Sequence, residues 1–281
     1  MSEGPVILEP IEDEVDNSKA PLLEHLLELR SRLIKCVLSL VVGCILCIPF
    51  LPQILAFLLS PFRTAVDKYN VEQIAAGREP LMTELIATQI LETFFVNVKL
   101  AIFGGIILAF PVIAFQVYRF VAPGLYKNER GAFLPYLILS PLLFSLGAAL
   151  VFYYVFPYVL SFGLNVAGSG DISLLPKISE YLSLAMTLFI AFGLSFQLPV
   201  VLSLLGRAGI VNSAALKKGR RYAVVGIAAF AAFVTPPDPM TQLVLGSAIY
   251  LLYEISIISV RLTEKKAQEA EAEPSAADTV P

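Results

Sequence analysis

The chain has 281 residues, of which 57% are hydrophobic and 15% are charged, and its formal net charge is −3 at pH 7. Together with a mean hydropathy of +0.77, these values exclude a water-soluble enzyme of this length. One histidine and the three cysteines Cys36, Cys44 and Cys47 do not provide a zinc site, and we expect the thiols to act as small packing residues. The composition predicts an all-α integral membrane protein without a metal.

The two ends of the chain differ from its middle. The first 20 residues are acidic and carry no basic cluster, so they do not have the form of a cleaved signal peptide. We therefore expect the first apolar stretch to remain as a membrane anchor. Residues 1–20 and 262–281 combine acidic, Ala, Ser and Pro residues without hydrophobic periodicity. This predicts two disordered tails around one membrane domain at residues 21–261.

Six apolar stretches follow in chain order, and most are long enough to cross a hydrocarbon core of about 30 Å. They lie at residues 34–51, 94–117, 133–159, 181–205, 222–234 and 243–260. The fifth would give about 20 Å of helix and the sixth about 27 Å. The run from Thr235 to Pro239, which contains three prolines, predicts a tight turn between them. Two short helices beside full spans predict a concave molecule.

Basic residues are concentrated in alternate connecting segments, and this asymmetry gives the predicted protein an orientation. Fifteen of the 20 Lys and Arg residues lie at residues 19–35, 119–130, 207–221 and 261–266. The opposite side carries Arg63, Lys68, Arg78 and Lys177, with Lys99 near the outer end of the second stretch. By the positive-inside rule, both termini are predicted to be cytoplasmic.

An amphipathic segment precedes the first stretch and contains a charged pair one helical turn apart, Glu28 and Arg32. Its apolar positions are Leu22, Leu26, Leu29 and Leu33. One interpretation of the pair is a surface salt bridge that contributes about 0.5 kcal/mol or less. The alternative is that a carboxylate on this basic cytoplasmic rim marks a site for a cationic ligand. Glu129 lies in the second cytoplasmic connection, where spacing alone favours a solvated loop.

Several segments together resemble the TatC family. They are EHLLELRSR at residues 24–32, APGLYKNER at 122–130, FGLSFQLP at 192–199, RRY at 220–222 and TPPD at 235–238. The resemblance covers residues 21–261, with the motifs in the family's order and with the family's six spans and cytoplasmic ends.

TatC is the core subunit of the twin-arginine protein translocase, so the resemblance implies a receptor. Such a receptor recognises signal peptides with a consecutive Arg pair on folded precursors and starts their export across the cytoplasmic membrane of a prokaryote. The resemblance implies that the proton-motive force supplies the energy. It also implies TatA-type and TatB-type single-span proteins, further TatC copies and the lipid bilayer as partners. It implies no cofactor, no enzymatic activity and no nucleic acid.

The resemblance also implies a binding site for the Arg pair. The positions of Glu28 and Glu129 contact that pair in the family, which is physically reasonable because a guanidinium matches a carboxylate with a planar fork that Lys lacks. Other matching positions surround this site. They are Arg30, which we expect to organise the carboxylates, and Phe120, Pro123, Leu125 and Tyr126, which would receive the hydrophobic residues after the Arg pair.

Three further polar residues match the family within or beside the membrane. Gln197 lies near the middle of the fourth stretch, where an amide alone would be interpreted as a contact between helices. The family often has Glu there, so Gln197 argues against a proton relay and leaves a polar docking or translocation role. Thr235 and Gln242 frame the outer turn, near the helices where the family places its single-span partners. For Glu254 we favour a locally paired or snorkelling carboxylate, and for Asp238 a helix cap.

Two other classes of function compete with the receptor. A multi-span secondary transporter of a small solute would also have kinked spans, but the intramembrane polar residues are few and no internal repeat is visible. An intramembrane serine protease needs a base within the membrane, yet His25 precedes the first stretch. Solute transport by the purified protein would favour the first alternative, and peptide cleavage the second.

Overall fold

The computed structural model describes residues 12–77, 80, 85–121, 134–167, 176–235 and 239–272. Within these ranges every regular element is helical, and one isolated bridge joins Ile86 to Lys177. The predicted all-α architecture is therefore confirmed. The α-helices are α1 (Glu12–Cys47), α2 (Leu51–Ala75), α3 (Glu92–Val121), α4 (Leu134–Leu150), α5 (Phe156–Ala167), α6 (Ile178–Ser195), α7 (Leu198–Arg207), α8 (Ser213–Val234) and α9 (Pro239–Ala272).

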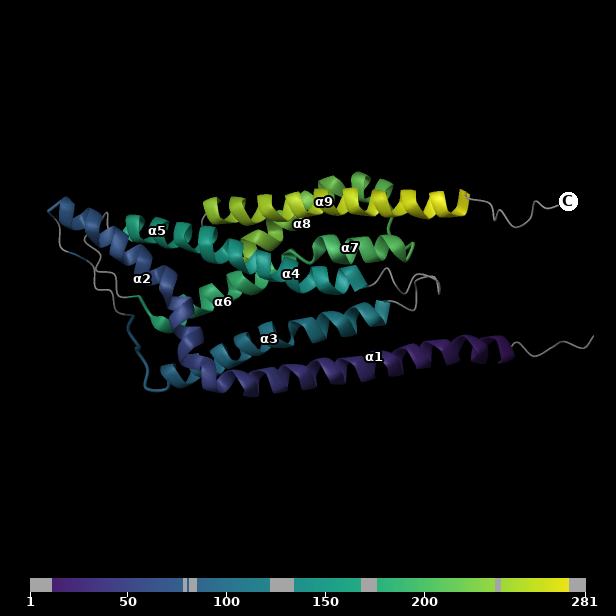
Figure 1. Ribbon diagram of the computed structural model, residues 1–281, viewed down its shortest axis with the longest axis horizontal. Coiled ribbons are helices and arrows are strands. Elements are labelled where there is room, and N and C mark those ends of the chain that lie inside the picture. Colours follow the sequence, from purple (N-terminus) through teal and green to yellow (C-terminus); the bar gives the residue numbers. More distant parts are fainter. Residues whose placement is uncertain are drawn as a thin grey trace, which may run out of the picture.

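Five described segments have the length and composition of membrane spans, and each contains or largely overlaps one of the predicted stretches. They are Leu26–Ala75, Glu92–Phe120, Tyr136–Val166, Ile178–Arg207 and Pro239–Lys265. The fifth predicted stretch, at residues 222–234, is not among them and forms the second part of α8. Figure 1 shows that α1, α3, α4, α7 and α9 run lengthwise along the molecule, whereas α2 crosses them obliquely. Helix α1 begins and α9 ends at the same end of the molecule (Figure 1).

Three of the apolar segments are interrupted. A 3₁₀ turn at Ile48–Phe50 separates α1 from α2, and a π-helical turn at Val151–Val155 separates α4 from α5. Helix α6 ends at Ser195, and α7 restarts at Leu198 with Pro199 in its first turn. Because proline lacks an amide hydrogen, it is tolerated at a helix start and disfavoured inside a helix. The fourth span is therefore two helices that meet at Gln197.

Helix α8 is longer than the apolar stretch that predicted it. It begins at Ser213, where the Asn212 Oδ1 accepts a hydrogen bond from the Ala215 amide at 2.7 Å. The Glu264 Oε1, on α9, accepts another from the Ser213 amide at 2.7 Å. These two side chains satisfy amides that every helix start leaves without an intrahelical partner. The 22 residues of α8 give about 33 Å of helix.

The first and last helices extend into the two segments that were expected to be disordered tails. Helix α1 begins at Glu12 and α9 continues to Ala272, so part of each segment expected to be disordered is helical. The residues from 262 to 272 are mainly Ala, Glu, Lys and Gln, which favour helix without contributing hydrophobic periodicity. The expected bounds of the membrane domain, at residues 21 and 261, stay a prediction.

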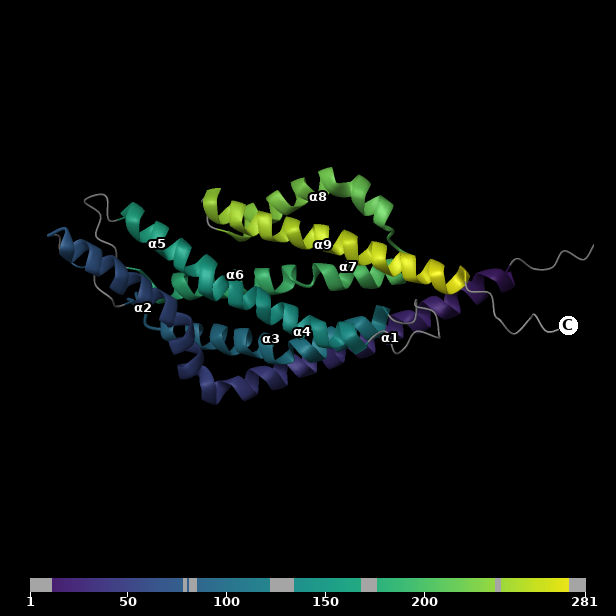
Figure 2. The ribbon, with the colours of Figure 1, turned by 45° about the horizontal axis from the view of Figure 1, so that its top comes forward.

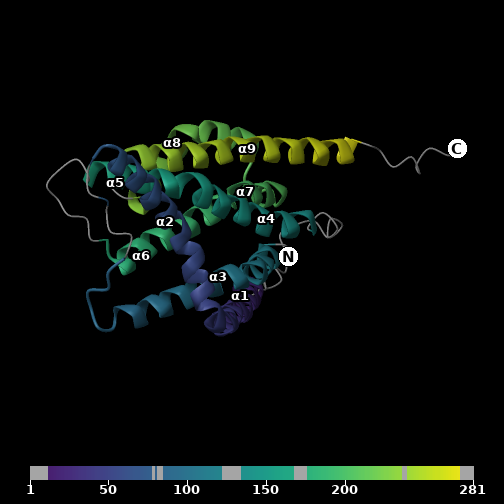
Figure 3. The same cartoon turned by 60° about the vertical axis from the view of Figure 1, so that its left-hand side comes forward.

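The helices form two edges around a buried core. Figure 3 shows α1 and α3 together on one edge and α8 and α9 on the other. In Figure 2, α8 lies beside α9, and α7 also packs against α9. Between the edges, fully buried side chains from α3, the α4–α5 break, the start of α5 and α6 form the centre of the core. They include Leu100, Val151, Phe156, Leu182 and Phe192.

Helices α1 and α3 approach closely at a crossing of small residues. A Cβ atom on Gly43 would lie 2.8 Å from the Gly105 carbonyl oxygen, and one on Gly105 would lie 2.5 Å from the Cys44 Sγ. Cys47 fills the same role against Gly104. All three cysteines are free thiols, and Cys44 and Cys47 pack as the sequence predicts. Close backbone approach of this kind is how membrane helices gain packing energy.

Candidate functional site

The predicted cytoplasmic site begins on α1, which carries the amphipathic segment and the first span as one continuous helix. The Arg32 Nε donates to the Glu28 Oε1 at 3.1 Å, and its Nη2 donates to the same oxygen. The Arg32 Nη1 donates to the Gln116 Oε1, on α3, at 3.5 Å. The Arg32 side chain is 13% exposed and that of Glu28 is 33% exposed. Arg32 therefore joins Glu28, on its own helix, to Gln116 on α3, and the Glu28 side chain stays one-third exposed.

The other described members of this site lie on α1 and α3. Arg30 is exposed on α1, and Phe120 is half-buried in the last turn of α3. Arg32 contacts the Glu28 carboxylate, while the organising role expected of Arg30 stays a prediction. The helical spacing of Glu28 and Arg32 predicted their pairing, whereas no sequence signal pointed to Gln116.

Four of the predicted site residues, Pro123, Leu125, Tyr126 and Glu129, lie outside the described residues. The helices on either side of this segment, α3 and α4, are described. Helix α3 ends at Val121 and α4 begins at Leu134, and these two helix ends lie at the same end of the molecule as the start of α1 (Figure 1).

A buried polar cluster surrounds Gln197 at the break between α6 and α7. Its Oε1 accepts a hydrogen bond from the Ser140 hydroxyl at 2.5 Å, and its Nε2 donates to the Ser140 carbonyl at 3.0 Å. The Tyr118 hydroxyl donates to the Ser140 Oγ at 2.7 Å. All three residues are buried. The cluster therefore ties α3, α4 and the α6–α7 break together, which agrees with the interpretation of Gln197 as a contact between helices.

The partners of Gln197 could not be found from the sequence. A buried amide needs several hydrogen-bond partners, which predicts that some exist. Tyr118 and Ser140 lie 79 and 57 positions away, and no periodicity connects them to Gln197. They are functional-site candidates that only the folded chain reveals.

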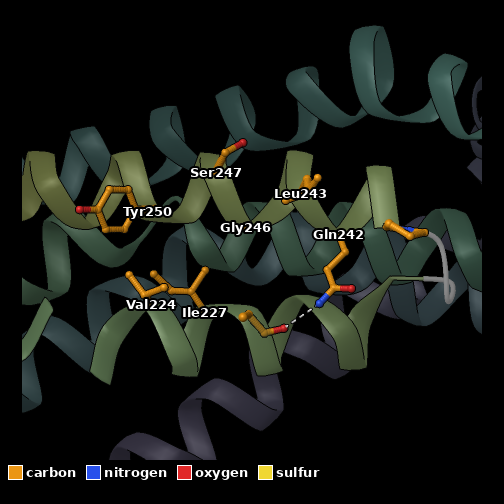
Figure 4. Close-up of a pocket in the computed structure, with 9 residues that line it drawn as sticks. Val224, Ile227, Gln242, Leu243, Gly246, Ser247 and Tyr250 are labelled. Atoms are coloured by element: carbon orange, nitrogen blue, oxygen red, sulfur yellow. Dashed lines mark hydrogen bonds between the residues drawn. The ribbon is translucent and has the colours of Figure 1, made fainter. Parts of the chain in front are cut away.

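A second candidate surface is a groove of about 590 Å³ between α8 and α9, shown in Figure 4. It is lined by Val224, Ile227, Ala228, Pro239, Gln242, Leu243, Gly246, Ser247 and Tyr250. The Gln242 Nε2 donates to the Ala228 carbonyl at 3.3 Å (Figure 4), while Leu243 is 66% exposed. The groove is mainly apolar, with an amide at one end and a phenol at the other.

Thr235 does not line this groove. It is buried at the end of α8, where its hydroxyl donates to the Ala231 carbonyl at 2.9 Å. It therefore ends the helix, and Gln242 is the one of this predicted pair that lies on the groove surface.

An ion pair fixes α8 to α9 one turn beyond the groove. The Arg220 Nη2, from the RRY motif, donates to the Glu254 Oε2 at 2.7 Å, and both side chains are partly exposed. The expectation that Glu254 is locally paired is confirmed. The next residue, Arg221, places its guanidinium 4.8 Å from the centre of the Tyr222 ring, a cation–π geometry.

The long apolar helices and the polar contacts between them define a multi-pass helical membrane protein. The family model for "Sec-independent protein translocase protein (TatC)" matches residues 24–247. The chain belongs to the TatC family, and so to the components of a Sec-independent protein translocase. The predicted family is confirmed.

Individual relatives agree with this assignment. The TatC protein of Magnetococcus marinus is 44% identical over 254 residues, covering 90% of this chain and 89% of that protein. The TatC protein of Escherichia coli (strain K12) is 36% identical over 251 residues, covering 89% and 92%. A solved structure described as "Crystal Structure of Twin Arginine Translocase Receptor- TatC" has a TM-score of 0.73 at 32% identity, covering 85% of this chain and 99% of that one.

Proposed function

We propose that this protein is the signal-peptide receptor and core subunit of a twin-arginine translocase that exports folded proteins with the proton-motive force. The observation that carries this proposal is the Glu28 side chain, which Arg32 holds in place and which is one-third exposed. Arg32, which holds it, also contacts Gln116 in the last two turns of α3, the helix that leads into the segment carrying Glu129. The receptor description of the solved TatC structure supports the same role.

The chemistry of Glu28 suits recognition of arginine. Two nitrogens of the Arg32 guanidinium donate to one of its oxygens, Oε1, and a carboxylate matches the planar fork that arginine presents and lysine lacks. A hydrogen bond to a charged group contributes about 1.5–3 kcal/mol. Two such sites, Glu28 and Glu129, would each receive one arginine of the pair. Phe120, Pro123, Leu125 and Tyr126 would then contact the apolar residues that follow, and Arg30 would help to organise the carboxylates.

The proposed topology has six spans with both termini in the cytoplasm of a prokaryote. The short apolar part of α8 is the fifth span, within a membrane domain at residues 21–261. The shared location of the start of α1 and the end of α9 supports an even number of crossings (Figure 1). A further apolar groove of about 650 Å³ supports a concave shape. It is lined in part by Cys47, Phe57, Phe103, Ser145 and Phe152.

The proposed partners are single-span TatA-type and TatB-type proteins, together with other copies of this chain. The α8–α9 groove is open, mainly apolar and of a size that accepts side chains from a transmembrane helix. Gln242 would provide the polar contact, because hydrogen bonds between helices strengthen association in lipid. Thr235 and Gln197 would act by positioning helices. This function requires no cofactor, enzymatic step or nucleic acid.

Export measured in cells whose own TatC has been replaced tests the proposal. We expect a folded reporter with an Arg-Arg signal to be exported and its Lys-Lys twin to be retained. Glu28→Gln and Glu129→Gln should each lower Arg-Arg export by about ten-fold, as the loss of one charge-assisted bond implies. Glu72→Gln is the matched control, because that carboxylate is exposed on α2, outside the proposed sites. Full Arg-Arg export by both cytoplasmic variants would contradict the proposal.

A further inference from the structure

A polar pocket lies at the opposite end of the molecule from the proposed receptor site, between the starts of α3 and α6. Its volume is about 360 Å³. It is lined by Thr88, Gln89, Glu92, Phe95, Val96, Lys99, Lys177, Ser179 and Glu180. Two lysines and two glutamates thus share one cavity, and the bonds of each decide which charge the pocket presents.

The Glu92 carboxylate is committed to the protein. Its Oε2 accepts from the Thr88 amide at 2.5 Å, the Thr88 hydroxyl at 3.2 Å and the Gln89 amide at 3.2 Å. Its Oε1 accepts from the Ser179 hydroxyl at 2.5 Å and the Ser179 amide at 3.4 Å. The side chain is only 6% exposed. Glu92 therefore ties α3 to α6 and forms one wall of the pocket, with both oxygens occupied by hydrogen bonds within the protein.

The two lysines have fewer contacts within the protein than Glu92 has. Lys177 forms an exposed pair with Glu180 at 3.5 Å, a type of contact that contributes little. Lys99 lies two turns inside the apolar segment, and its Nζ donates to the Ser183 hydroxyl at 3.0 Å. Among the described residues it forms no ion pair. An ammonium group within a membrane segment requires an anionic partner or access to the interface.

We propose that this pocket binds the phosphodiester headgroup of an anionic phospholipid, with Lys99 as the central cation and Lys177 at the rim. The phosphate would give the Lys99 ammonium an anionic partner in addition to the neutral Ser183 hydroxyl. A lipid suits the pocket better than free phosphate because exposed aromatic side chains lie beside it, Phe95 on its wall and Phe94 next to it. These rings offer contact to glycerol and acyl carbons. Under the proposed topology, the lipid belongs to the outer leaflet.

The test uses the purified full-length protein in detergent, titrated with phosphatidylglycerol, phosphatidylcholine or inorganic phosphate. Native mass spectrometry counts bound lipids and thermal unfolding measures the gain in stability. We expect phosphatidylglycerol to bind more tightly than phosphatidylcholine, and Lys99→Gln to weaken it about five-fold, as removal of one lysine near a lipid surface implies. Lys99→Arg should retain the binding. Lys68→Gln is the matched control, because Lys68 is exposed on α2 outside the pocket.

Three outcomes would overturn the proposal. Equal loss of phosphatidylglycerol in the Lys99→Gln and Lys68→Gln variants would show that only surface charge matters. Equal stabilisation by inorganic phosphate at the same concentration would assign the pocket to a soluble anion. Unchanged binding in a double Lys99→Gln, Lys177→Gln variant would place the lipid elsewhere. If Lys99→Gln does not fold, Lys99→Met, which keeps the length of the side chain without its charge, replaces it in each of these comparisons.

Discussion

Arg32 holds the Glu28 carboxylate with two nitrogens of one guanidinium, one of them at 3.1 Å. Because Arg32 is the more buried of the two, it acts as a support for Glu28 and its removal should loosen the carboxylate. We predict that Arg32→Gln weakens Arg-Arg peptide binding about three- to ten-fold, as loss of roughly 1 kcal/mol of positioning implies. Isothermal titration of the purified protein measures this. Tighter binding in the variant would show that Arg32 competes with the ligand.

The buried cluster around Gln197 gives a prediction about stability. Ser140→Ala removes the hydroxyl that bonds both Gln197 and Tyr118, so buried polar atoms lose partners. We expect a loss of about 1–3 kcal/mol in the free energy of unfolding. Ser145→Ala is the control on the same helix, since that exposed hydroxyl bonds only the carbonyl of Pro141. Thermal unfolding in nanodiscs compares the two, and equal melting temperatures would contradict the role of the cluster.

The crossing of α1 and α3 should tolerate no added carbon. A Cβ on Gly105 would lie 2.8 Å from the Cys44 amide nitrogen, and backbone cannot move aside as a side chain can. We predict that Gly105→Ala destabilises the protein by about 1–3 kcal/mol, the usual cost of overpacking. Gly163→Ala, on α5, meets nothing within 4 Å and should be neutral or slightly stabilising. The ranking of the two melting temperatures is the readout, and the reverse order would refute close packing here.

The α8–α9 groove can be filled to test partner docking. Gly246 lies on its floor, and its nearest neighbour to an added Cβ would be Ile227 at 3.9 Å, so Gly246→Leu should project into the groove and leave the fold intact. The added leucine would exclude a partner side chain from the groove. We expect co-purification of a TatB-type partner to fall about ten-fold, because one such apolar contact contributes about 1–2 kcal/mol. Gly226→Leu is the control, an exposed position on α8 outside the groove. Equal recovery of the partner by both variants would exclude the groove.

Much of the fold could be predicted from hydrophobicity alone. Long apolar runs predict helices in a bilayer because a helix forms all its backbone hydrogen bonds within the segment. Five of the six runs form part of the described spans. Hydropathy did not predict the start of α8 at Ser213, because Asn212 and Glu264 create that start through hydrogen bonds. Nor did it predict the break at Gln197, since Pro199 alone is compatible with a simple kink.

The candidate site was only partly predictable for a related reason. Helical spacing connects Glu28 to Arg32, and the structure contains that pair. Contacts between distant segments leave no such signal. Arg32 reaches Gln116 across 84 positions, and Glu92 reaches Ser179 across 87. These contacts depend on how the helices cross, and that is decided by packing at small residues such as Gly105.

The most direct measurement of the receptor claim is the affinity of the purified protein for an Arg-Arg signal peptide and for its Lys-Lys twin. The unmodified protein should bind the Arg-Arg peptide about ten-fold more tightly, because only a guanidinium matches the carboxylate fork. Glu28→Gln should remove most of that preference while leaving the weaker Lys-Lys binding nearly unchanged. Equal affinity for both peptides, unaltered by the substitution, would contradict the account.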